Sequence, residues 1–168
     1  MSFYQACRIG NLKKVKDYLY FHDFDINTQN ELGYTGLHYA CFYGKIKIVK
    51  YLIEELGADL EMMNLSNSTP FLVAVENNQY NVVKYLLNIA DISIFDKFGY
   101  NALHKAIYNN NIQMIKLLMS ANDGNEIWID PRSKLDYNYF SAIEYAKILH
   151  KNEILDLIDV YFCISGTQ

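Results

Sequence analysis

Apolar residues recur along this chain with a period close to 33 residues. Five alanines, which stand 34, 34, 32 and 40 residues apart, mark the period: Ala6, Ala40, Ala74, Ala106 and Ala146. Apolar residues follow each alanine nine and twelve positions later: Val15 and Tyr18, Val49 and Leu52, Val83 and Leu86, Ile115 and Leu118, Leu155 and Ile158. Because a spacing of three keeps such residues on one face of a helix, the pattern predicts an amphipathic second helix in every unit.

Turn and cap residues keep the same register as the alanines. Four residues after each alanine come Gly10, Gly44, Asn78, Asn110 and His150. A turn that needs positive φ between two helices favours Gly and Asn at this position. The first helix of units two to five opens at Thr35, Thr69, Asn101 and Ser141. Their short side-chain oxygens can accept an unpaired backbone N–H at a helix start, so the pattern predicts stacked helix-turn-helix units.

A sequence motif lies between the cap and the turn. It runs from Gly33 to Gly44, returns almost unchanged from Gly99 to Asn110, and has a degenerate copy from Asn67 to Asn78. These stretches resemble the ankyrin repeat signature, Gly-x-Thr-Pro-Leu-His-x-Ala, which that family follows with a Gly four residues after the Ala. The resemblance covers almost the whole chain. It implies an all-α fold, an ankyrin-repeat solenoid of five helix-turn-helix units with short β-hairpin fingers.

We expect a single ankyrin-repeat domain over residues 1–168. Its units span approximately 1–29, 30–63, 64–95, 96–135 and 136–162, and the wide spacing before Ala146 places an inserted loop at 122–132. The last unit departs from the signature, since Glu144 stands where His38 and His104 stand in earlier units. A terminal repeat needs a polar outer face, so this departure indicates a cap.

Composition narrows the possible functions. Hydrophobic residues make up 51% and charged residues 20% of the chain, and the net charge is −4 without a basic run. This argues against sequence-independent nucleic-acid binding. No apolar run approaches the roughly 20 residues that span a bilayer, and the first residues lack the pattern of a secretory signal. Three cysteines without metal-type spacing favour free thiols in a reducing compartment, so we expect a cytoplasmic protein with no membrane contact.

Candidate chemical groups have structural explanations. By the resemblance, His38 and His104 brace the turn through hydrogen bonds, and a whole unit between them prevents them from sharing a metal. Cys7 and Cys41 occupy the same small position in successive units, where burial between helices is expected. The chain has no Gly-rich phosphate loop, Gly-x-Ser-x-Gly or His-Glu-x-x-His motif. We therefore expect no cofactor, no metal and no enzymatic activity.

The resemblance implies that a partner contacts the finger tips and the exposed side of the first helices. Large side chains occupy many of these positions, although the repeat core does not require them: Leu32, Tyr34, Phe42, Tyr43, Met63, Phe95, Phe98, Tyr100, Tyr108 and Phe140. Large apolar groups facing water suggest an interface, and the alternative is that they pad neighbouring units or reflect codon bias. Trp128, in the inserted loop, either joins the binding face or shields the last unit.

These features favour a non-enzymatic protein–protein interaction module that binds a protein partner on a concave aromatic face. Such a module acts as an adaptor or as an inhibitor. The alternative is a dedicated microbial immunity protein or a pathogen-encoded decoy that blocks a toxin or a host signalling factor. A monomer is favoured over a homodimer, and an enzyme would require a cleft with perturbed titratable groups.

Overall fold

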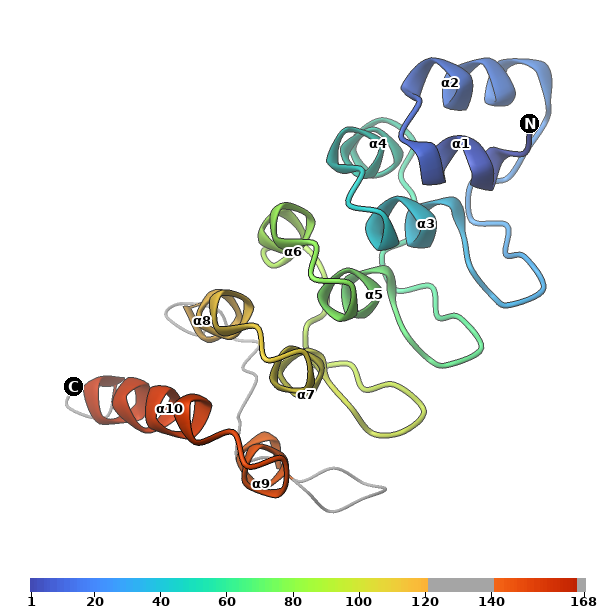
Figure 1. The fold of residues 1–168 in the computed structure, drawn as a ribbon. Helices are drawn as coiled ribbons and strands as arrows, with labels where there is room; N and C mark the ends of the chain where they lie inside the picture. The colour runs from blue at the N-terminus through green and yellow to red at the C-terminus, as the bar shows by residue number, and fades with distance from the viewer. Residues whose placement is uncertain (121–140, 166–168) are drawn as a thin grey trace.

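The computed structural model describes residues 1–120 and 141–165, with side chains as far as Tyr161. Within these residues the chain forms five helix pairs that stack in chain order into an elongated array (Figure 1). The bounds of the first helices are α1 (Phe3–Ile9), α3 (Gly36–Phe42), α5 (Pro70–Glu76), α7 (Ala102–Tyr108) and α9 (Ala142–Ile148). The second helices are α2 (Leu12–Phe21), α4 (Ile46–Lys50) with its π-helical continuation η1 (Tyr51–Glu55), α6 (Tyr80–Leu86), α8 (Ile112–Ser120) and α10 (Asn152–Ser165).

The predicted caps and turns are confirmed. Thr35, Thr69, Asn101 and Ser141 are N-cap residues, and each side chain accepts the backbone N–H three residues later. At the turns, φ is positive at every predicted position: 79° at Gly10, 65° at Gly44, 57° at Asn78, 54° at Asn110 and 54° at His150. Local backbone requirements thus explain why these residue types recur.

The core follows the predicted period, with one change at the last helix. All five marker alanines are buried, as are Cys7 and Cys41. Among the described side chains of α10 the buried ones are Ile154 and Ile158, and Leu155 is only partly buried. Tyr18, in the first unit, is also partly exposed. The two terminal helices have a neighbouring pair on one side only (Figure 1), so their apolar faces are covered less completely.

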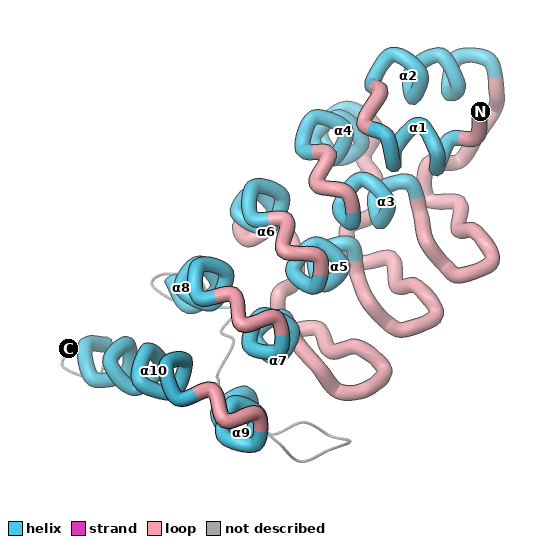
Figure 2. The backbone as a smooth tube through the Cα atoms, viewed as in Figure 1, coloured by secondary structure: helices cyan, strands magenta, loops and turns pink. Residues whose placement is uncertain are grey.

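The fingers are tight turns that project toward the same side of the array (Figure 2). We name them finger A (Asn30–Tyr34), finger B (Asn64–Ser68) and finger C (Asp96–Tyr100). In each, the first and last residues are joined by a backbone N–H to carbonyl bond of 3.0, 3.1 and 3.0 Å. A second backbone bond, from the N–H of Gly33, Asn67 or Gly99 to the carbonyl of the first finger residue, closes each turn at 2.8–2.9 Å. The predicted β-hairpins are reduced to these turns, since no strand occurs within residues 1–120 or 141–165.

A side chain replaces the missing strand pairing in each finger. The Oδ1 atom of the first residue accepts two backbone N–H groups, from the residues two and four positions later, at 2.8–3.1 Å. Neighbouring fingers are also bonded to each other. The N–H of Leu65 donates to the carbonyl of Leu32 at 3.1 Å, and that of Lys97 donates to the carbonyl of Ser66 at 2.9 Å. The finger tips are therefore held at fixed spacing.

Candidate functional site

A groove of about 630 Å³ lies between the fingers and the first helices of the third, fourth and fifth units. Its aromatic lining is Tyr34, Phe98, Tyr100, Tyr108 and Tyr145. Its other lining residues are Asn64, Ser66, Ser68, Glu76, Asn77, Asp96, His104, Lys105 and Asn109. A volume in the range of roughly 300–1,000 Å³ is typical of binding sites, so the groove can hold one or more side chains of a partner.

Aromatic rings form one wall of the groove. The rings of Tyr100, His104 and Tyr145 lie 5.3–5.8 Å apart, centroid to centroid. Burial raises the pKa of Tyr145 to about 12, with a smaller contribution from the neighbouring Tyr100, so the Tyr145 hydroxyl stays protonated at neutral pH. At the other end, burial and then the charge of Glu76 raise the pKa of Tyr34. The groove therefore presents neutral phenol groups beside a carboxylate.

A charged cluster forms the floor between finger C and α7. The ammonium of Lys105 lies 2.7 Å from Asp96 Oδ2 and 3.2 Å from Glu76 Oε2. The side chains of Asp96 and Lys105 are 3% and 11% exposed, whereas that of Glu76 is 55% exposed. Asp96 also accepts the two backbone bonds that close finger C. This ion pair links the finger to the helix, and the cluster keeps an excess negative charge at Glu76.

Two comparisons with known protein families agree with this architecture. A family model described as ankyrin repeats (3 copies) matches residues 3–96, and a second, ankyrin repeats (many copies), matches residues 88–119. The chain belongs to the ankyrin repeat family. The expectation of an ankyrin solenoid is thereby confirmed.

Similar proteins carry ankyrin repeats within much longer chains. Alpha-latrotoxin-Lg1a of Latrodectus geometricus is 37% identical over 91 residues, which are 52% of this chain and 7% of the toxin. Palmitoyltransferase AKR1 of Naumovozyma castellii is 33% identical over 119 residues, 70% of this chain and 16% of that protein. SH3 and multiple ankyrin repeat domains protein 2 of Homo sapiens is 26% identical over 128 residues, 75% of this chain and 7% of that protein. The chain thus spans less than a fifth of each relative.

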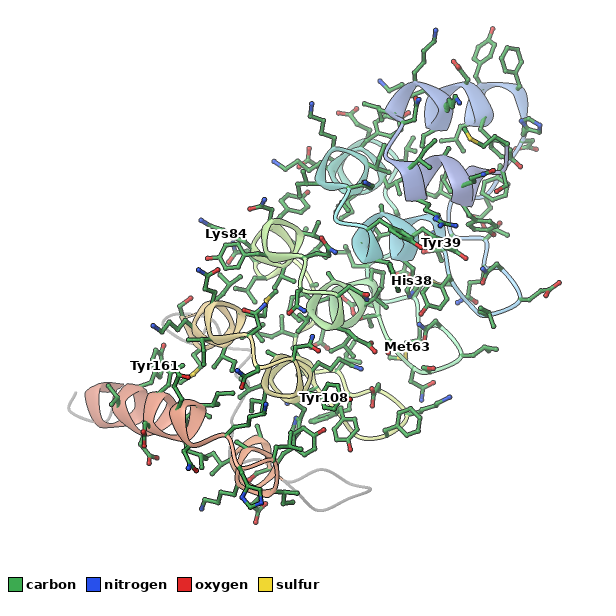
Figure 3. The ribbon with its side chains drawn as sticks, in the orientation of Figure 1. His38, Tyr39, Met63, Lys84, Tyr108 and Tyr161 are labelled. Carbon is green, nitrogen blue, oxygen red and sulfur yellow. The ribbon has the colours of Figure 1, made fainter. Side chains whose placement is uncertain are left out.

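The structure brings four of the candidate contact residues of this ankyrin array together. Tyr34, Phe98, Tyr100 and Tyr108 line the groove, and Tyr108 is 67% and Phe98 55% exposed. Three others are exposed on or just before the fingers without lining the groove: Leu32 at 61%, Met63 at 43% and Phe95 at 39%. Figure 3 shows Met63 and Tyr108 on the finger side of the array, away from Lys84 on α6.

The remaining candidates lie elsewhere. Phe42 and Tyr43 are partly buried at the end of α3, where their rings contact each other at 4.7 Å. The guanidinium of Arg8 lies 5.1 Å from the centre of the Tyr43 ring, so this pair also packs against the first unit. Phe140, Trp128 and the predicted insertion at 122–132 fall outside the residues that the structure describes.

The set of contact residues predicted from the sequence left out several groups at this site, among them Tyr145, Lys105 and Glu76. Tyr145 and Lys105 directly precede the marker alanines of their units, as Tyr39 does, and that shared register could have drawn attention to them. Glu76 occupies the same register position as Phe42 and Tyr108, two residues after the alanine. Leu65, which is 67% exposed, was also not predicted. It stands two positions before Asn67, which holds the signature glycine position in this unit, and is not one of the residues directly flanking that position.

The histidines and cysteines have structural environments. The Nδ1 atom of His38 accepts the backbone N–H of Thr35 at 3.1 Å, so Nε2 carries the proton and donates to the carbonyl of Ser68 at 3.1 Å. Burial lowers the pKa of His38 to about 4, and the predicted bracing role is confirmed. Burial also raises the pKa of the Cys7 thiol to about 12 and raises that of Cys41. These thiols are therefore protonated and inert at neutral pH.

The described part of the chain offers neither a metal-binding cluster nor a membrane-spanning helix. There, no group of three or more His, Cys, Asp or Glu side chains is arranged to hold a metal ion. Over the same residues, no helix has both the length and the apolar character needed to cross a membrane.

Proposed function

We propose that this chain is a non-enzymatic protein-interaction module that binds its partner through the groove and the adjoining finger tips. The observation that carries the proposal is the clustering of exposed large side chains at the groove and on the fingers beside it. Tyr108 and Phe98 are exposed at the groove, and Leu32 and Leu65 are exposed on neighbouring fingers. Clustered exposed apolar groups next to polar ones are typical of protein interfaces, where Tyr and Phe give much contact area with few rotatable bonds.

The rigidity of the site supports the same proposal. Each finger is closed by its own Asn or Asp side chain, and adjacent fingers share backbone hydrogen bonds. His38 and Lys105 tie fingers to first helices through Ser68 and Asp96. A surface that is ordered before binding loses less conformational entropy when the partner arrives.

The chemistry of the described residues favours binding over catalysis. The buried thiols are held protonated and His38 is held neutral, so neither is available as a nucleophile or a proton carrier. One relative is a palmitoyltransferase, but the matched segment is 16% of that protein. The match supports a shared repeat segment and gives no support for transferring the activity. The proposal also includes no cofactor, a monomeric state and a cytoplasmic location.

An adaptor and an inhibitor would use this surface differently. An adaptor leaves the partner active, whereas an inhibitor blocks it. The inhibitor role includes that of a microbial immunity protein or a pathogen-encoded decoy that blocks a toxin or a host signalling factor. An activity assay on the captured partner, with and without this chain, separates the two.

The test is affinity capture from the source cell's extract with wild type and two matched double variants. Phe98→Ser/Tyr108→Ser removes two large side chains at the groove, which are 55% and 67% exposed, without adding a charge. Tyr20→Ser/Phe21→Ser is the control, because these side chains are 84% and 75% exposed at the far end of α2. Equal thermal midpoints would establish that both variants fold. The proposal expects a protein that wild type and the control retain and the groove variant loses; equal retention by all three would refute it.

A further inference from the structure

The groove carries more negative than positive charge. Asp96 and Glu76 supply two carboxylates, and Lys105 supplies one ammonium that contacts both. The Lys105 ammonium is therefore already neutralised, and its side chain is only 11% exposed. The exposed member of the cluster is Glu76, at 55%. A partner group that enters the groove meets a net negative charge.

Aromatic rings flank that charge. Phe42, Glu76 and Tyr108 occupy the same register position at the ends of α3, α5 and α7, which pack side by side. Glu76 is thus the carboxylate between two aromatic residues of neighbouring units. Tyr34, on finger A, lines the same groove as Glu76. Lys97 already lies over the Phe98 ring at 5.1 Å, whereas Tyr34 and Tyr108 line the same groove as Glu76.

We infer that the groove receives an arginine or lysine side chain of the partner protein, with its charge against Glu76 and its stem and head on the rings of Tyr34 and Tyr108. This inference rests on the proposed function and names the chemistry that the partner brings. Cations are attracted to the negative faces of aromatic rings, and the attraction grows as water is excluded. The fold already uses such pairs, for example Lys16 over Tyr51 at 4.8 Å and Lys50 over Tyr85 at 5.0 Å.

Other partner groups fit less well. An acidic or phosphorylated side chain would approach Glu76 and Asp96, while Lys105, the cation among the residues that line the groove, is already shared between them. A purely apolar side chain would remove water from the Glu76 carboxylate without replacing its hydrogen bonds, which is unfavourable. A basic side chain satisfies the carboxylate and covers the rings with its methylene stem.

Phage display tests the inference. Random twelve-residue peptides are displayed on phage and selected for binding to the wild-type protein. We expect the enriched peptides to share an Arg or Lys. Synthetic copies should bind Glu76→Gln about threefold to tenfold more weakly, since one partly exposed charge contact is lost. Glu55→Gln is the matched control, because Glu55 is exposed on η1, outside the groove lining. It should bind the peptides like wild type.

A second pair of variants tests the ring contact. Tyr108→Phe keeps the aromatic face and should retain binding, whereas Tyr108→Leu keeps apolar bulk without that face and should weaken binding about threefold to tenfold. Tyr108 is 67% exposed, so neither change threatens the fold.

The outcomes separate this inference from the proposed function. Enriched peptides that lack a basic residue and do not bind Phe98→Ser/Tyr108→Ser would overturn the inference and support the groove as a binding site. Peptides that bind all groove variants like wild type, or no enrichment at all, would also overturn the inference. The capture experiment then decides the proposed function on its own.

Discussion

Replacing Lys105 by Met should destabilise this ankyrin array strongly. The substitution leaves Asp96, whose side chain is 3% exposed, with a buried charge and no cation. Removing one member of a buried ion pair typically costs about 3–5 kcal/mol, because the other charge remains unpaired. Asp96 keeps its two backbone N–H bonds in finger C, at 2.9 Å each, which stabilise the carboxylate in part. We therefore expect a loss of about 2–4 kcal/mol in the free energy of unfolding.

A second substitution should restore the lost free energy of unfolding. Asn occupies the equivalent finger position twice, at Asn30 and Asn64, and makes the same pair of backbone bonds there without a charge. Asp96→Asn combined with Lys105→Met removes both charges and keeps the finger closed. The double variant should lie within about 1 kcal/mol of wild type. Asp96→Asn alone should cost less than Lys105→Met, since Lys105 still contacts the exposed Glu76.

Urea unfolding followed by far-ultraviolet circular dichroism measures these changes. Lys84→Met is the control, because Lys84 is exposed on α6 (Figure 3) and its loss should change stability by less than about 0.5 kcal/mol. A double variant as unstable as Lys105→Met alone would refute the reasoning. It would mean that the packing of the lysine stem, and not the unpaired carboxylate, sets the cost.

The other predictions concern stability at two further positions. The pKa of His38 is lowered from 6.5 to about 4, so the folded state binds fewer protons than the unfolded state. The neutral ring contributes fully to the free energy of unfolding above pH 6.5. This contribution of about 3 kcal/mol should be lost as pH falls toward 4. His38→Gln should flatten that pH dependence in urea unfolding, and an unchanged slope would assign the effect to other groups. Gly33→Ala should cost more than Gly57→Ala by at least about 1 kcal/mol: both have positive φ, but a Cβ at Gly33 would lie 2.8 Å from Asn64 Cα, while Gly57 has open space. Equal thermal midpoints for the two variants would contradict this.

The repeating part of the fold could be predicted because its requirements are local. A helix start needs a side-chain oxygen, a turn with positive φ needs Gly or Asn, and a helix contact needs a small residue. Thr69, Asn78 and Ala74 meet these needs and keep the period. Where tertiary surroundings decide, the sequence was less informative. Leu155 was predicted as buried, but Ile154 takes that place in a helix with a neighbour on one side only.

The candidate site was predictable in its aromatic part only. Exposed Tyr108 and Phe98 stand at register positions that the core does not use, so a repeat alignment identifies them. The charged cluster joins residues of three segments, Glu76, Asp96 and Lys105, whose meeting depends on how consecutive units stack. Phe42 and Tyr43 look equally suited to a partner in the sequence, but their rings pack against each other, a contact that no spacing predicts.

The bonds between neighbouring fingers make the finger row a mechanical unit. The amides of Leu65 and Lys97 belong to residues whose side chains face solvent, and both amides are donated to the finger before. Their hydrogen exchange therefore reports directly whether the fingers stay together. A force that a partner applies to finger C passes through Ser66 into finger B, and through Leu32 into finger A. The finger tips therefore move together, and a force that a bound partner applies is distributed over three units of the array.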